Sequence, residues 1–502
     1  MSYAKLEATF RRIGHLDHAV AMLEWDEAVM MPAAAGPHRA EAVASLYGLR
    51  HQQYTQPQLA DWFAAAQEEA KAGSLHDFQK ANLQEMHRTW QRIVALPQDL
   101  VEASKKAESA SEQAWRGLRA KNDWESFRPK LQAVVALKKE VAAALGSALN
   151  LSPYDALIDG FEPGMRCAEI DRLFADLGAF LPMFTEAVLA KQSQESFVQP
   201  QGPFPVAQQR ALGLRLMEAV GFDMAHGRLD TSHHPFCGGV PSDVRITTRY
   251  NESDFTSALM GVLHEAGHAK YEQGLPREWA ALPAGSARGM AMHESQSLLQ
   301  EMQVSRGAAF LSFATPIMRE CMPEAAARAP EAFTASNITR LSTRVRRGFI
   351  RVDADEVTYP CHVILRYEIE RALFEHKITV ADIPELWDQR MQALLGLSTV
   401  GNFKDGCMQD VHWPAGLFGY FPSYTLGALT AAQLFAAATE QLPGLQDEIA
   451  RGNFEPLNGW LRTYVWSKAS LYSGDDILKA ATGKSLSTEA FKAHVQRRYL
   501  EG

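Results

Sequence analysis

Apolar residues recur at three- and four-residue steps along most of the 502 residues, which is the spacing of one face of an α-helix. Between residues 124 and 146 leucine and valine follow this spacing closely, and Gly146 is expected to end that helix. Proline and glycine interrupt the pattern at short intervals, as at Pro32, Gly73 and Pro97. The sequence therefore predicts a mainly α-helical body built from a succession of separate helices.

One region, between Arg228 and Tyr250, departs from the helical period. Residues 243–250 alternate in steps of two, so that on a strand Val244 and Ile246 would share one face. We therefore expect a small β-sheet within the helical body. Because the chain has no Gly/Ser- or Pro-rich linker and no internal repeat, residues 1–502 are expected to form one domain, of one or two lobes.

Charge and composition exclude several classes of protein. Lys and Arg number 50 and Asp and Glu 59, which gives a net charge of −9 and argues against a general nucleic-acid binder. The five cysteines are scattered, which is typical of neither a disulfide framework nor a cysteine zinc site. No uncharged apolar run approaches the roughly 18 residues of a membrane span, and no secretory signal is recognisable. A cytoplasmic protein without a membrane partner is expected.

The strongest chemical signal is a pair of histidines, His264 and His268, within a predicted helix that Gly274 ends. Histidines four residues apart lie on the same helix face, so both imidazoles can bind one metal ion. Glu265, beside the first of them, is suited to hold and deprotonate a water on that ion. So short a pattern also occurs by chance, but here the required helix is predicted around it.

A catalytic zinc site needs a third protein ligand and leaves the fourth position to water. Glu294 is the candidate, 26 residues after His268 in a second helical stretch from 290 to 306. Two histidines and one glutamate favour Zn²⁺, one per chain, with Co²⁺ or Mn²⁺ able to substitute. These residues predict hydrolysis of an amide, in which Glu265 accepts a proton from water and passes it to the leaving amine.

Six motifs, which include the histidine pair and Glu294, occur in order between Thr231 and Tyr424. They are HPF at 234–236, DVRIT at 243–247, HEAGH at 264–268, HESQ at 293–296, IRVDAD at 350–355 and GCMQDVHW at 406–413. With these motifs the chain resembles the carboxypeptidase Taq family of zinc metallocarboxypeptidases.

The resemblance implies a mainly α fold similar to neurolysin and angiotensin-converting enzyme, with a small sheet and a deep cleft that holds the metal. It also implies zinc-dependent release of single C-terminal residues from peptides with a free C-terminus. Side-chain tolerance would be broad, with proline disfavoured, and the protein would be a homodimer. By motif match, the ligands would be His264, His268 and Glu294, and the catalytic base Glu265.

An exopeptidase must also recognise the free carboxylate of its substrate, a task that suits the planar guanidinium of arginine. Arg351 and Arg245 are the candidates, and Arg351 is favoured because a family motif centres on it. The alternative for each is a structural ion pair. For Arg245 the partner would be Asp243, and for Arg351 it would be Asp353 or Asp355.

A tetrahedral oxyanion needs a hydrogen-bond donor in addition to the metal. His412 and Tyr420 are candidates, since this stretch is similar to the histidine-then-tyrosine arrangement in the cleft of angiotensin-converting enzyme. Tyr424 is the substitute for Tyr420, unless these tyrosines only pack a helix start. His234 precedes Pro235, so we expect it to be extended, either on the cleft floor or bridging backbone groups.

Metal-binding imidazoles usually donate a hydrogen bond to a further carboxylate, for which Asp410 and Asp355 are candidates. Two other functions compete with the carboxypeptidase. One is a zinc endopeptidase or oligopeptidase that uses the same metal without a clamp for the substrate carboxylate. The other is a non-catalytic binding protein with a vestigial metal site, against which the intact Glu265 argues.

Overall fold

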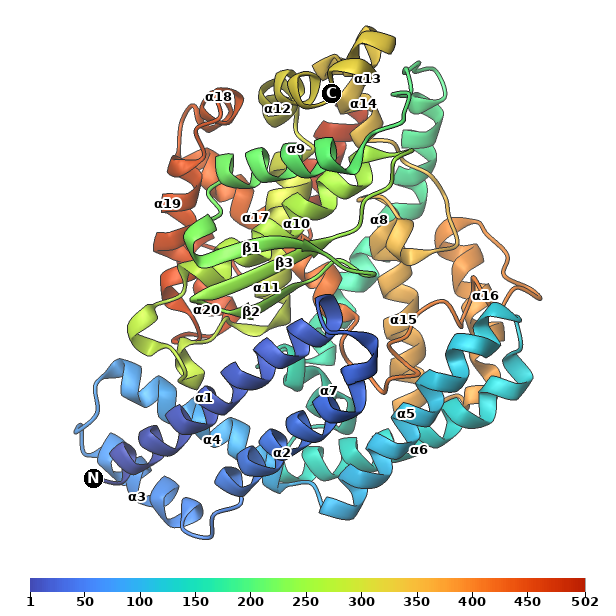
Figure 1. Ribbon diagram of the computed structural model, residues 1–502. Helices are drawn as coiled ribbons and strands as arrows, with labels where there is room; N and C mark the ends of the chain where they lie inside the picture. Colours follow the sequence, from blue (N-terminus) through green and yellow to red (C-terminus); the bar gives the residue numbers. More distant parts are fainter. Residues whose placement is uncertain (502) are drawn as a thin grey trace.

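Helices dominate residues 1–501, which are described by a computed structural model (Figure 1). The predicted succession of helices is confirmed. Before the sheet the helices are α1 (Ser2–Val29), α2 (Gly36–Tyr54), α3 (Leu59–Lys71), α4 (Asp77–Val94), α5 (Gln98–Ala120), α6 (Trp124–Leu149), α7 (Pro153–Phe161), α8 (Cys167–Gln192) and α9 (Val206–Ala219).

The helices after the sheet complete the body, and the first of them packs against the sheet. They are α10 (Phe255–Gly274), α11 (Gly289–Leu298), α12 (Ala308–Cys321), α13 (Pro323–Arg328), α14 (Ala335–Ser342), α15 (Tyr359–Phe374), α16 (Ile383–Leu395), α17 (Pro422–Gln441), α18 (Leu445–Ala450), α19 (Glu455–Tyr464), α20 (Gly474–Thr482) and α21 (Glu489–Gln496). Two π-helical segments, Leu299–Ser305 and Arg497–Glu501, directly follow α11 and α21.

A three-stranded sheet lies in front of α10 and α11 in Figure 1. In order across the sheet, the strands are β1 (Gly227–Thr231), β3 (Asp243–Thr248) and β2 (Cys237–Val240). Strand β3 pairs with β1 in parallel and with β2 in antiparallel fashion. As predicted, Val244 and Ile246 are both buried, and β3 packs against α10. The sheet thus forms a wall beside the helix that carries the two histidines.

The predicted end of α6 at Gly146 is wrong, because the helix continues to Leu149 and ends at Asn150, whose φ is 55°. A Cβ atom at Gly146 would lie 2.8 Å from the carbonyl oxygen of Leu151. This glycine therefore permits the chain to return closely past the helix. At Gly73, by contrast, the predicted break does fall just after α3, with φ at 76°.

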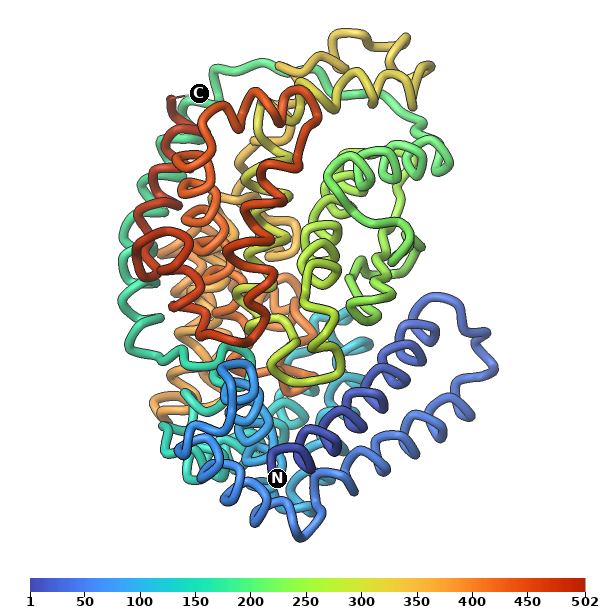
Figure 2. The backbone as a smooth tube through the Cα atoms, turned by 90° about the vertical axis from the view of Figure 1, so that its left-hand side faces the viewer, coloured from blue at the N-terminus to red at the C-terminus, as the bar shows by residue number. Residues whose placement is uncertain are grey.

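Two hydrophobic clusters stabilise the fold. The larger extends from Trp124 to Tyr499, and a smaller one joins α1 to α4 around Phe10 and Phe63. Figure 2 shows that the α1–α2 hairpin extends away from the rest of the chain. Near the end of α1, Trp25 contacts the sheet residue Arg245, whose guanidinium lies 4.6 Å from the ring centroid. The organisation as one domain of one or two lobes stays a prediction.

Helix α8 is long and apolar enough, by length and composition alone, to cross a membrane. Its residues Ile170, Leu173 and Leu177 are fully buried in the larger hydrophobic cluster. Core helices of soluble proteins also meet this criterion of length and composition, and 39% of the apolar window of α8 is buried inside the structure.

The end of the chain is held by one buried carboxylate, that of Glu356, which is 7% exposed. It lies 2.8 Å from Nε2 of His494 and accepts hydrogen bonds from the hydroxyl of Tyr499 at 3.0 Å and from Nη1 of Arg498 at 3.1 Å. Burial alone would raise the pKa of Glu356, but His494 and Arg498 lower it to about 2. The carboxylate is therefore charged at neutral pH and joins the C-terminal segment to the start of α15.

We predict that Glu356→Gln lowers the free energy of unfolding by about 3 kcal/mol at pH 7, because Arg498 loses its buried counter-charge. The pKa of Glu356 is about 2 in the folded protein and about 4.5 in the unfolded chain. Its stabilisation is thus complete above about pH 4.5 and is lost as the pH falls towards 2. Urea unfolding should show that the difference between wild type and variant shrinks with falling pH, while both proteins still fold. A difference that does not change with pH would contradict this assignment.

Candidate metal centre

Helix α10 presents His264 and His268 on one face. The helix begins after Asp254, whose carboxylate accepts a hydrogen bond from the backbone N–H of Thr256 at 2.9 Å. One helical turn separates the two histidines, and their ring centroids lie 5.1 Å apart. The local sequence thus fixes the direction of both imidazoles.

Helix α11 brings Glu294 to the same point. One potential ligand atom from each of His264, His268 and Glu294 lies within 4.8 Å of the other two. The Nε2 atom of His268 and the Oε2 atom of Glu294 are 3.3 Å apart. Bonds of about 2.1 Å to a tetrahedral ion would place neighbouring ligand atoms roughly 3.4 Å apart. Two nitrogen donors and one oxygen donor at these separations fit a divalent transition metal.

Glu301 holds the His264 ring from behind. Its Oε2 lies 2.9 Å from Nδ1 of His264, and its Oε1 accepts a hydrogen bond from Nη2 of Arg306 at 2.7 Å. Burial alone would raise the pKa of Glu301, but Arg306 and His264 lower it to about 2. The acid is therefore a charged acceptor that leaves Nε2 of His264 facing the site.

The expectation that Asp410 or Asp355 would hold a ligand imidazole is wrong. Asp355 accepts hydrogen bonds from backbone N–H groups, including that of Thr358 at 3.0 Å, and Asp410 binds arginines. A signal for Glu301 was present in the sequence, because it follows Glu294 by seven residues and so returns to nearly the same helix face.

His293, in the HESQ motif, supports the second histidine. Its backbone carbonyl lies 3.1 Å from Nδ1 of His268, and its own Nδ1 lies 2.6 Å from that atom. The Nε2 atom of His293 is 2.8 Å from Oε1 of Glu272. Sequence reasoning did not assign this role to His293 or Glu272.

Glu265 is buried beside the three potential ligands and is 7% exposed. Burial raises its pKa to about 7, with Glu294 raising it further and His264 opposing the rise. A carboxyl group with this pKa can both accept and donate a proton near neutral pH.

Two glycines allow the helices of the site to approach closely. A Cβ atom on Gly267 of α10 would lie 2.4 Å from the carbonyl oxygen of Gln296 in α11. On the other side of α11, a Cβ atom on Gly427 of α17 would lie 2.8 Å from Cβ of Glu294. Helix α11 is thus packed between α10 and α17 at distances that only glycine permits.

Both candidate clamp arginines form ion pairs. Arg245 binds Asp243 through Nε and Nη2, at 2.9 and 2.6 Å, which is the pairing considered as its structural alternative. Arg351 pairs with Asp410 at 2.8 Å, so the expectation of Asp353 or Asp355 as its structural partner is wrong.

Asp410 is shared by two buried arginines. Its Oδ2 accepts a hydrogen bond from Nε of Arg366 at 2.6 Å, while Oδ1 binds Arg351. Although burial would raise the pKa of Asp410, Arg366 and Arg351 hold it well below its usual value. One carboxylate between two guanidinium groups leaves an excess positive charge at this point.

Arg351 connects this charge to the metal centre. It is 5% exposed, and its Nη1 donates a hydrogen bond to the hydroxyl of Tyr359 at 2.6 Å. Burial is the main reason why the pKa of Tyr359 rises to about 12, and the nearby charge of Glu294 contributes. Arg245, in contrast, contacts Asp243 and Trp25 on the sheet.

The aromatic candidates lie together near the start of α17. The Nε2 atom of His412 is 3.2 Å from the hydroxyl of Tyr424, and the rings of Tyr420 and Tyr424 meet edge to face with centroids 5.3 Å apart. Burial lowers the pKa of His412 to about 4 and raises that of Tyr420 to about 12, so both are neutral at pH 7. His234 lies exposed between β1 and β2, with its ring against His233.

Two imidazoles and a carboxylate from adjoining helices, with a further buried carboxylate beside them, are the ligand and base set of a metal-dependent hydrolase. Comparison with known proteins agrees. The profile of the Carboxypeptidase Taq (M32) metallopeptidase family matches residues 5–499. Thermostable carboxypeptidase 1 of Thermus thermophilus is 37% identical, over 99% of this chain and 98% of its own length.

Solved structures give the same result. Metallocarboxypeptidase 1 of Trypanosoma cruzi is 39% identical with a TM-score of 0.96, and the match covers 99% of both chains. The M32 carboxypeptidase of Deinococcus radiodurans is 32% identical with a TM-score of 0.93, over 100% of this chain and 99% of that one. The chain therefore belongs to the carboxypeptidase Taq family of metallopeptidases.

Family membership makes the protein a metal-dependent peptide hydrolase and supports metallocarboxypeptidase activity. It favours an enzyme over a non-catalytic binding protein. The fold is the helical one related to neurolysin and angiotensin-converting enzyme, as the resemblance implied.

We predict that Gly267→Ala lowers the affinity for metal by at least about tenfold and destabilises the fold by about 1–3 kcal/mol, because the new methyl group pushes α10 away from Gln296 of α11. Gly261→Ala in the same helix is the matched control. A Cβ atom there meets no atom within 4 Å, so metal affinity should not change. Chelator competition and thermal unfolding measure both effects, and equal behaviour of the two variants would refute the role given to Gly267.

Proposed function

We propose that the protein is a zinc carboxypeptidase that releases single C-terminal residues from peptides with broad specificity. The observation that carries this proposal is the convergence of His264, His268 and Glu294 to within 4.8 Å, with the buried Glu265 beside them. Zinc, one ion per chain, suits this mixture of imidazole and carboxylate donors, and cobalt or manganese can occupy the same donors.

When bound, the ion supplies Lewis acidity for hydrolysis of the peptide bond. Glu265 accepts the proton of the attacking water on its carboxylate and then donates it to the leaving amine. Its pKa of about 7 supports this double role, because both protonation states are accessible near neutral pH. Glu301, itself held by Arg306, keeps the ring of His264 in the orientation that binding requires.

Arg351 is the proposed anchor for the free carboxylate of the substrate. The excess positive charge of Arg351 and Arg366 over Asp410 supports this choice, as does the contact of Arg351 with Tyr359 near Glu294. Arg245 is the second candidate, but its bidentate pair with Asp243 already neutralises it. A C-terminal proline is disfavoured because its scissile amide lacks an N–H group and its ring fixes φ.

His412 and Tyr420 are the proposed donors to the oxyanion that forms on the scissile carbonyl. Both are neutral at pH 7 and can donate a hydrogen bond to a developing negative charge. The charge of Glu294 contributes to the raised pKa of Tyr420, which supports a position close to the metal centre. Tyr424 is the substitute, and we assign it and His234 to substrate binding.

The proposal also includes a cytoplasmic location, which the sequence analysis led us to expect, and a homodimer, which the family resemblance implies. Size-exclusion chromatography with light scattering tests the second of these, because a dimer would double the 55.6 kDa of one chain.

Elemental analysis of the purified protein, together with mass spectrometry of digested peptides, tests the whole proposal. We expect one zinc per chain and a ladder of peptides shortened one residue at a time from the C-terminus. A chelator should abolish the activity and zinc should restore it. Internal cleavage, with equal rates on a peptide and its C-terminally amidated twin, would instead establish the endopeptidase.

Glu265→Gln should keep the metal but lower kcat by several orders of magnitude, because the ligands remain while the proton acceptor is gone. Metal content by elemental analysis and turnover of a peptide substrate measure the two effects. Glu278→Gln, an exposed position after α10, is the control and should leave both unchanged. Normal turnover in Glu265→Gln would show that another group is the base.

Arg351→Ala should lower kcat/KM for a free-carboxylate peptide roughly 10- to 100-fold, mainly through KM, and affect the amidated twin much less. The reason is that the lost charge-assisted hydrogen bonds exist only with the free carboxylate. Arg245→Ala is the comparison variant. Equal losses on both substrates would make Arg351 structural, and a selective loss in Arg245→Ala would transfer the role to Arg245.

A further inference from the structure

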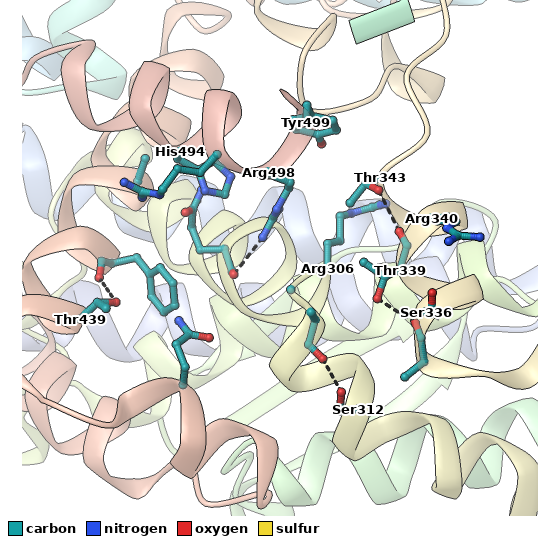
Figure 3. A pocket seen from close by; sticks show the side chains of 18 of the residues that line it. Arg306, Ser312, Ser336, Thr339, Arg340, Thr343, Thr439, His494, Arg498 and Tyr499 are labelled. Carbon is teal, nitrogen blue, oxygen red and sulfur yellow. Dashed lines mark hydrogen bonds between the residues drawn. The ribbon is translucent and has the colours of Figure 1, made fainter. Parts of the chain in front are cut away.

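A cavity of about 1120 Å³ lies behind the metal centre, between α12, α14, α17 and the C-terminal segment (Figure 3). Cationic side chains exceed carboxylates in its lining, although the whole chain has a net charge of −9. The cations are Lys191, Arg306, Arg340, Arg497 and Arg498, and the carboxylates are Glu195 and Glu440. Arg306, Arg340 and Arg498 approach the cavity from three different segments in Figure 3.

The charged groups of the lining differ in the ion pairs and hydrogen bonds that they already form with other residues. Arg498 binds Glu356 at 3.1 Å and so belongs partly to the C-terminal anchor. Glu195 is paired with Arg344 at 2.9 Å, which removes one of the two carboxylates as a counter-charge for the cavity. Arg340 and Arg497 are both exposed, and Arg340 donates a hydrogen bond to the carbonyl of Ser196 at 3.2 Å. These two guanidinium groups retain donors for a ligand.

We propose that this cavity binds a small organic polyanion, a molecule with two or more phosphate or carboxylate groups. Guanidinium groups bind both kinds of anion through paired hydrogen bonds. The volume is slightly larger than that of a typical small-molecule site, and the apolar wall formed by Ala432, Phe435 and Ala436 suits an organic framework between the charges.

The cavity shares one residue with the metal centre. Arg306 lines it and also donates two hydrogen bonds to Oε1 of Glu301, at 2.7 and 3.2 Å. The other oxygen of Glu301 lies 2.9 Å from Nδ1 of His264. An anion on Arg306 therefore competes with Glu301 for the same guanidinium. Any effect of this competition on peptide hydrolysis rests on the proposed function, whereas the binding of the anion itself does not.

Isothermal titration calorimetry tests binding on the intact metal-loaded protein at constant ionic strength. The probes are fructose 1,6-bisphosphate and tricarballylate, which represent phosphate and carboxylate, and elemental analysis afterwards checks that the metal is retained. We expect one-to-one binding of at least one probe. The probe that binds more tightly shows whether the site favours phosphate or carboxylate groups. Binding of neither probe overturns the proposal.

The double variant Arg340→Gln/Arg497→Gln should weaken binding at least tenfold while hydrolysis is unchanged. The matched control is Arg210→Gln/Arg319→Gln, which removes two exposed arginines outside the lining and should keep the wild-type affinity. Equal weakening in both double variants would indicate a diffuse charge effect. Unchanged affinity in the first would place the probe elsewhere. Either result overturns the site.

Glu301→Gln tests the shared guanidinium, because it releases Arg306 from its counter-charge. The affinity for the probe should rise about three- to tenfold in this variant. Arg306→Lys keeps the positive charge but loses the paired N–H donors of the guanidinium, so it should lower the affinity. If Glu301→Gln does not fold, Arg306→Lys alone tests this point. An unchanged affinity in Arg306→Lys would overturn the claim that the anion binds the guanidinium shared with Glu301. Failure of the proposed function would appear as absent metal or absent hydrolysis, independently of these affinities.

Discussion

The distance between α10 and α11 determines whether the three potential metal ligands can meet. The helix period fixes His264 relative to His268, but the third potential ligand lies on another helix and depends on tertiary packing. Gly267 allows the backbone of α11 to touch α10, and Gly427 lets α17 press α11 from the opposite side. A metal site tolerates ligand displacements of only about 0.2 Å, so the small size of these two residues matters as much as the ligands themselves.

Buried acids in this protein act as shared acceptors. Glu301 lies between His264 and Arg306, Glu356 between His494 and Arg498, and Asp410 between two arginines. In each case burial favours the neutral acid and neighbouring cations reverse this preference. Because the pKa of each acid stays below its usual value, each carboxylate is charged at neutral pH and fixes the orientation of the partners that it binds.

Sequence periodicity predicted the features that depend on neighbours along the chain. The helices, strand β3 and the alignment of His264 with His268 are of this kind, because periods of 3.6 and 2.0 determine which residues share a face. The acceptor behind His264 was only partly accessible in this way, because the seven-residue spacing from Glu294 puts Glu301 on a nearby helix face without fixing its partner. Its identity depends on the π-helical continuation of α11, which sets the direction of Glu301, and short motifs do not encode that turn.

The two candidate arginines for the substrate carboxylate show a second limit of sequence reasoning. Both occur in family motifs and both form ion pairs, so neither residue type nor pairing distinguishes them. The difference lies in the number of arginines that bind each aspartate. Arg245 has Asp243 to itself, whereas Arg351 and Arg366 share Asp410, which leaves one buried positive charge without a full counter-charge.

An uncompensated buried charge is costly unless a ligand neutralises it, and a substrate with a free C-terminal carboxylate brings the missing negative charge. An amidated or internal peptide segment would leave the cost in place. The charge balance around Asp410 therefore supports the proposed exopeptidase on physical grounds that do not depend on any sequence motif. It favours Arg351 as the proposed anchor, because this residue also donates a hydrogen bond to Tyr359, whose pKa the charge of Glu294 influences.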